Sequence, residues 1–202
     1  MKEFSVSMAL VDFIPVILFA VSAALMQKEF YGKMKRSAFV LFSSGTVSIV
    51  FAGGLKALYK LLYAIGVCDF EALSQPFMPL QSIGFMLTGV ALIMMIVQNK
   101  KNAPLMAAAA PAAYNGTMLF VGLMVTGLAL MTGGLCAYAK NKKKYSAIAL
   151  FIVTFICLLG MGYLSSRDFS KASFNWIAEG VNVTGQLALL GGVTVIWEKN
   201  KI

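Results

Sequence analysis

The chain has 202 residues, of which 59% are hydrophobic and only 12% are charged. This composition excludes a soluble domain, because water-soluble chains of similar length are far less apolar. The 17 Lys and Arg outnumber the 8 Asp and Glu, but most basic residues fall in short runs between apolar segments. That pattern is typical of loops beside lipid headgroups, so no nucleic-acid partner is expected. With no His and no CxxC pair among three Cys, neither a metal site nor a cofactor is expected.

Six apolar stretches come close to the roughly 20 residues that a membrane-spanning helix needs. They cover about 8–27, 38–60, 78–98, 117–139, 145–165 and 174–197. Because they use nearly the whole chain, we expect an all-α, polytopic membrane helix bundle with one transmembrane domain, 1–202. The first stretch should remain as a helix, since Asp12 interrupts the apolar region that a signal peptide requires. The sequence therefore predicts an integral membrane protein, most simply of the cell membrane.

The third connector divides the chain into two parts. Segment 102–116 has two prolines and an alanine run, and it is too short and too broken to cross a bilayer. It predicts a linker between a first three-helix half, 1–101, and a second, 117–202. The order of features agrees between the halves better than their letters do, so a duplication stays open. Because three is odd, duplicated halves would form an inverted repeat, as in many transporters.

Six crossings would place both chain ends on the same face of the membrane. Under this alternation the Lys and Arg residues are nearly balanced between the two faces. The positive-inside rule therefore leaves the orientation undecided.

A glycine pattern recurs in three of the stretches. It reads GFMLTG at 84–89, GLMVTG at 122–127 and GVNVTG at 180–185. Glycine and threonine four residues apart let helix backbones approach closely where lipid gives no hydrophobic drive to associate. We interpret the pattern first as a packing device.

The last apolar stretch carries a polar stripe. At about 100° per residue, one side of the helix holds Asn175, Trp176, Glu179, Asn182 and Gln186. Another side holds Gly180 and Thr184, which we expect to pack against a neighbouring helix. A central acidic residue costs about 2.5–3.5 kcal/mol in lipid, so the stripe should face protein or water. Two interpretations stay open: hydrogen bonds between helices, or the wall of a solute pathway in which Glu179 is a cation or proton site.

A second polar group is expected towards one face of the membrane. Its members are Asp12, Lys56, Lys60 and Gln81. Asp12 is either the N-cap of the first helix or an ion-pair partner of a lysine. The lysines either reach the headgroups or form a vestibule that attracts anions. The neighbouring pair Gly53 and Gly54 suggests a hinge, because glycine pairs are common at helix bends.

These features favour a small multi-pass membrane transporter or channel-like permease for a polar or ionic solute. The alternative is a membrane-embedded substrate-capture or accessory subunit, working with a partner membrane protein or as a homo-oligomer. An enzyme is not expected. Intramembrane lipid chemistry would need paired carboxylates, whereas alternation places Asp12 and Glu179 at different depths near opposite faces.

Overall fold

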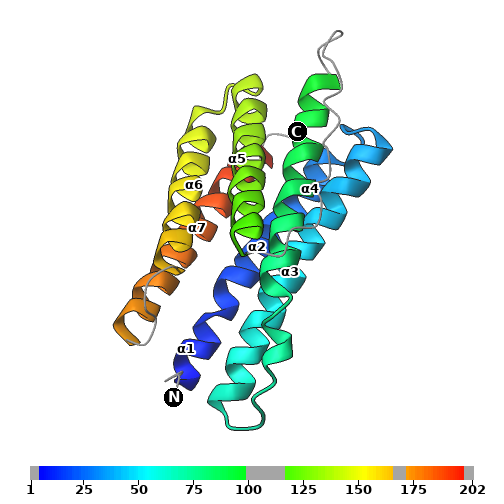
Figure 1. The fold of residues 1–202 in the computed structure, drawn as a ribbon. Coiled ribbons are helices and arrows are strands. Elements are labelled where there is room, and N and C mark those ends of the chain that lie inside the picture. The colour runs from blue at the N-terminus through cyan, green and yellow to red at the C-terminus, as the bar shows by residue number, and fades with distance from the viewer. Residues whose placement is uncertain (1–4, 99–116, 166–171, 198–202) are drawn as a thin grey trace.

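The computed structural model describes residues 5–98, 117–165 and 172–197 (Figure 1). Its helices are α1 (Val6–Val11), α2 (Phe13–Phe30), α3 (Arg36–Ala64), the short 3-10 helix η1 (Glu71–Leu73), α4 (Phe77–Gln98), α5 (Thr117–Asn141), α6 (Tyr145–Ser165) and α7 (Ala172–Trp197). Six helical segments, with α1 and α2 counted as one and η1 joined to α4, are long and apolar enough to cross a membrane. The predicted six-helix membrane bundle is therefore confirmed. The predicted linker, 102–116, lies outside the described residues.

The first membrane segment begins with a cap, but Asp12 does not supply it. The Ser5 side chain accepts a hydrogen bond from the backbone N–H of Met8 at 3.3 Å and caps α1. Asp12 sits between α1 and α2 with helical dihedral angles, φ −57° and ψ −23°, and its side chain makes no capping hydrogen bond. The N-cap interpretation of Asp12 is therefore wrong. Because the helical path continues through it, its carboxyl group is available for contacts with other helices.

Helices α4 and α5 run in the same direction. A Cβ atom on Gly127 would lie 2.5 Å from the backbone nitrogen of Met86, and one on Gly134 would lie 2.8 Å from Leu92 Cβ. A later residue of α5 thus contacts a later residue of α4, so the two helices are parallel neighbours (Figure 1). Gly89 also faces the Gly127 carbonyl, where its Cβ would lie at 2.8 Å. At this crossing the recurring glycine pattern acts as the packing device that the sequence predicted.

The three long helices of the second half consequently run in the same directions as those of the first half. Duplicated halves were instead expected to be inverted relative to each other. Within each half, short connections make successive long helices antiparallel neighbours, and α2 packs alongside α7 as well. Gln98 and Thr117, which flank the 99–116 segment, lie at opposite ends of the α4–α5 pair, so the expectation that this connector begins and ends on one face of the membrane is wrong. Counting crossings by strict alternation fails for this reason, and α1 begins at the end opposite to that where α7 finishes (Figure 1). Duplication of the halves stays a prediction.

Charge is distributed unevenly between the two ends of the bundle. The connections after α2 and after α5 share one end, because Lys33 and Lys142 both contact Glu29. We call this the basic end, since its described residues include Lys28, Lys33, Lys35, Arg36, Lys140, Lys142, Lys143 and Lys144. The opposite, acidic end contains the connection 65–76, with Asp69 and Glu71 and no Lys or Arg.

The fully buried aromatic side chains lie mainly towards the basic end. The ring of Phe30 packs edge-to-face against Phe42, with centroids 5.3 Å apart, and against Tyr138 at 5.0 Å. Other side chains that are completely covered there include Met26, Leu92, Met131, Leu135, Phe151 and Leu189. This packing fills the bundle near the basic end and leaves its main cavity nearer the acidic end.

Candidate functional site

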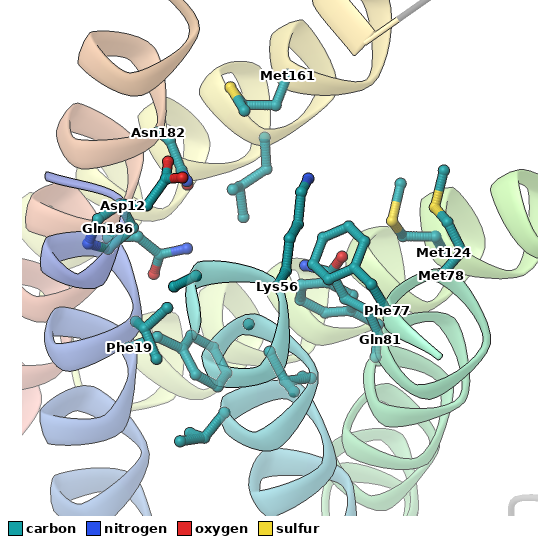
Figure 2. A pocket seen from close by; sticks show the side chains of 18 of the residues that line it. Asp12, Phe19, Lys56, Phe77, Met78, Gln81, Met124, Met161, Asn182 and Gln186 are labelled. Carbon is teal, nitrogen blue, oxygen red and sulfur yellow. The ribbon is translucent and has the colours of Figure 1, made fainter. Parts of the chain in front are cut away.

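A cavity of about 340 Å³ lies between the two halves, and all six long helices contribute to its lining. Its polar lining side chains are Asp12, Lys56, Lys60, Gln81, Glu179, Asn182 and Gln186. The sequence predicted these residues as two separate groups, and the structure brings both groups into one space (Figure 2). The volume is within the range of small-molecule binding sites.

Three buried charged groups meet on one side of the cavity. The Lys60 ammonium lies 2.5 Å from Asp12 Oδ2 and 3.5 Å from Glu179 Oε1. The exposed fractions of these side chains are 14% for Lys60, 7% for Asp12 and 9% for Glu179. We call this set the Lys60 triad. The expectation that Asp12 and Glu179 lie near opposite faces is wrong, because α2 and α7 run parallel and place both carboxyl groups at the same depth.

The triad leaves acceptor atoms without donors. Gln186 Oε1 is buried, and no donor within the described residues bonds to it; Glu179 Oε2 is also buried and lacks a donor unless its carboxyl shares a proton with the neighbouring carboxyl of Asp12. Asp12 Oδ2 contacts Lys60 but has no well-directed hydrogen bond among the described groups. Buried polar atoms in folded proteins almost always have a partner. A donor group brought by a ligand or by water would satisfy these atoms.

Lys56 stands apart from the triad, one helical turn before Lys60. Its ammonium lies 4.0 Å from the centroid of the Phe77 ring. Among the described residues, no carboxylate lies within ion-pair distance of it. Figure 2 shows Lys56 between the side of the cavity that holds Gln186 and the side that holds Phe77 and Gln81. The cavity thus contains an ammonium group that has no direct counter-ion within the part of the chain that the structure describes.

The rest of the lining is apolar and flexible. It includes Phe19, Phe85, Met124, Leu128 and Met161. Methionine side chains adapt their shape to the group they contact. Sequence reasoning missed these residues, because a lining Met or Phe within an apolar stretch has the same pattern as a core residue.

Other residues of the last helix lie outside the cavity. Trp176 is 46% exposed and faces outward, and Asn175 is buried but does not line the cavity. Gly180 and Thr184 are exposed, so among the described helices of this chain none packs against their side of α7, contrary to the expectation. Gly185 faces α6 instead. The reason is that α2 and α6 contact the other sides of α7 and leave this one towards the surroundings of the bundle.

The proposed hinge lies beside the cavity. Helix α3 continues without interruption through Gly53 and Gly54. Gly53 lines the cavity, and a Cβ on it would lie 3.1 Å from a methyl group of Val16, whereas Gly54 faces open space. Bending at this position stays a prediction.

A third buried carboxylate, outside the cavity, joins the halves at the basic end. Glu29 Oε1 accepts hydrogen bonds from the Tyr138 hydroxyl at 2.6 Å, from Lys33 at 2.6 Å, and from Lys142. The Glu29 side chain is 3% exposed. Sequence reasoning treated Glu29 as part of a loop, although its spacing of four residues from Lys33 is typical of an ion pair on a helix. The contacts link α2 in the first half to α5 in the second.

No relative assigns a chemistry to this site. Within the described ranges, no three His, Cys, Asp or Glu residues gather as a metal-binding set. Comparisons with protein-family models, with curated proteins and with solved structures give no significant match to this chain. The function must therefore be argued from the side chains of the cavity.

Proposed function

We propose that this protein is a small multi-pass membrane transporter or channel-like permease for a polar or ionic solute, and that the cavity is its solute-binding site. The observation that supports this most is the pair of buried acceptors, Glu179 Oε2 and Gln186 Oε1, to which no described group other than the Asp12 carboxyl offers a hydrogen bond. If the polar stripe served only to join helices, protein donors would be expected at these atoms. Ionisable groups inside a membrane span most often mark solute or ion pathways.

The position of the cavity is consistent with alternating access. Transporters commonly bind solute between two halves and rock one half against the other. Here the cavity lies between α1–α4 and α5–α7, and the Glu29 contacts with Tyr138 and Lys142 connect the halves on the side of the basic end. Opening towards the basic end would have to break these contacts. We propose that they form the closed gate of this conformation.

Reconstitution tests the proposal. Purified wild-type protein in liposomes is exposed to concentration jumps of amino acids, organic amines, carboxylates and inorganic salts, while charge movement and uptake of labelled solute are recorded. We expect uptake or current with at least one class, and its loss in Glu179→Gln, which keeps the size of the side chain and removes the charge. Glu71→Gln is the matched control, because Glu71 is exposed outside the cavity. Absence of flux for every class would overturn the proposal.

One observation favours the alternative, a substrate-capture or accessory subunit. The exposed side of α7 presents Gly180 and Thr184 next to the outward-facing Trp176. Small residues on an exposed side suit close docking of another helix, either from a partner membrane protein or from a second copy. A protein that binds a solute in detergent but moves none across liposomes would support this alternative. We propose no enzymatic role.

A further inference from the structure

The charges of the cavity narrow the class of solute, on the basis of the proposed binding site. We propose that the cavity binds an organic zwitterion, with its ammonium group at Glu179 and Gln186, its carboxylate at Lys56, and its apolar part against the Met and Phe side chains. The proposal uses groups on both sides of the cavity.

The side of the cavity that holds Glu179 and Gln186 requires a hydrogen-bond donor from the ligand. As whole residues, Glu179 and Gln186 are each only 7% exposed, and each keeps a buried oxygen without a donor when the carboxyl groups of Glu179 and Asp12 are both ionised. Lys60 is also shared by two carboxyl groups at once, so the Lys60 triad carries one formal negative charge when all three groups are ionised. A carboxylate and an amide oxygen are acceptors, and an ammonium group offers three donors together with a positive charge. An ammonium group therefore matches the unfilled part of this side.

The Lys56 side requires an acceptor. An ammonium group only donates hydrogen bonds, and Phe77 offers the Lys56 ammonium only the face of its ring, at 4.0 Å. A carboxylate would supply both charge and acceptor atoms. Figure 2 places Gln81 on the same side, where its amide could also contact the ligand.

The sum of the charges favours a zwitterion over a single ion. Asp12, Glu179, Lys56 and Lys60 balance when all four are ionised. A ligand with one net charge would add an uncompensated charge inside the membrane span, which is unfavourable. A zwitterion preserves neutrality while it contacts both sides. The cavity of about 340 Å³ leaves room for an apolar chain against Phe19, Phe85, Met124 and Met161.

The test compares matched ligands on the purified full-length protein. Leucine is compared with 3-methylbutylamine and 4-methylpentanoate, each of which keeps the chain and one charge. The zwitterion 6-aminohexanoate, with more widely separated charges, is compared with pentylamine and hexanoate. We expect at least one zwitterion to bind about tenfold or more tightly than both of its singly charged counterparts, as for an added charge-assisted contact. Binding is measured by isothermal titration in detergent.

Two variants test which residue binds the carboxylate of the ligand and which binds its ammonium group. Lys56→Met should remove the advantage of the zwitterion over the amine, whereas Glu179→Gln should remove its advantage over the carboxylate. Lys56→Gln is a second variant if Lys56→Met does not fold, and Glu71→Gln should leave the ranking unchanged.

The results separate this inference from the proposed function. A single-charge analogue that binds as tightly as its zwitterion, or a failure of both zwitterions to bind, overturns the inference. Flux of another ion in the liposome experiment would then leave the permease proposal standing. Zwitterion binding that depends on Lys56 and Glu179, without any flux, supports the inference and favours the capture subunit instead.

Discussion

Removing the ammonium group of Lys60 tests the buried triad most directly. Lys60→Met keeps the length of the side chain and leaves Asp12 and Glu179 without the group that lies 2.5 Å and 3.5 Å from them. Removing one partner of a buried ion pair costs about 3–5 kcal/mol. Because two carboxyl groups lose the same counter-ion, we expect a loss of roughly 3 kcal/mol or more, at least about a hundredfold in the folding equilibrium.

The assay is reversible unfolding in mixed detergent micelles, followed by tryptophan fluorescence. Lys56→Met is the matched control, because it makes the same change one turn earlier on α3, where no described carboxylate forms an ion pair with the lysine. Loss of its contact with Phe77 should cost about 0.5–2 kcal/mol. Equal losses for the two variants would refute the reasoning, since the triad would then contribute no more than an ordinary contact.

Replacing all three charged side chains of the Lys60 triad by neutral ones is a second test of the same interaction. Replacing buried ionic groups together by neutral side chains of similar volume is often close to neutral in stability. The combination of Asp12→Asn, Lys60→Met and Glu179→Gln should therefore recover most of the stability that Lys60→Met loses. Losses that simply add up across the three single variants would mean that the groups do not interact.

Three further predictions concern the packing of the halves. Cysteines placed at Tyr31 and at Tyr145, in a chain whose native cysteines are replaced by alanine, should react with an impermeant maleimide from the same side of the membrane; reaction from opposite sides would contradict the parallel arrangement. Gly127→Ala should destabilise the protein by about 1–3 kcal/mol, because its Cβ would lie 2.5 Å from backbone, whereas Gly122→Ala, with no atom within 4 Å, should be tolerated in the same unfolding assay. Glu29→Gln should speed amide hydrogen exchange at the ends of α2 and α5 if the buried carboxylate holds them together, and unchanged exchange would remove it as a gate.

Hydropathy was sufficient to locate the helices. The stretch predicted at 145–165 coincides with α6, and the one predicted at 174–197 lies within α7. Apolar residues dominate these segments and charged residues border them. The limits of the helices therefore follow from the preference of the lipid core for apolar residues. Periodicity likewise identified Glu179 and Gln186 as members of an inward-facing stripe, because lipid excludes such groups from the opposite side.

Relative helix direction could not be obtained in this way. Alternation assumed that α4 ends and α5 begins on the same face, and that assumption separated Asp12 from Glu179. The contacts of Gly127 with Met86 and of Gly134 with Leu92 together determine the actual direction, and they depend on tertiary packing that no single stretch encodes. The role of Glu29 was missed for a related reason, since its partner Tyr138 lies 109 residues away.

The loop charges give an argument for the parallel arrangement that is independent of helix packing. Under strict alternation the connections 31–35 and 142–144 lie on opposite faces and their basic residues cancel. In the structure both connections, with five Lys between them, lie at the basic end. Of the two connections at the acidic end, 65–76 has no Lys or Arg, and the sequence 166–171 has one of each. Membrane insertion places positively charged short loops in the cytoplasm. The arrangement that follows from glycine packing therefore also restores the charge asymmetry expected of an inserted protein. It predicts that the basic end is cytoplasmic and that the cavity lies closer to the opposite face, so solute would reach the Lys60 triad first from outside the cytoplasm.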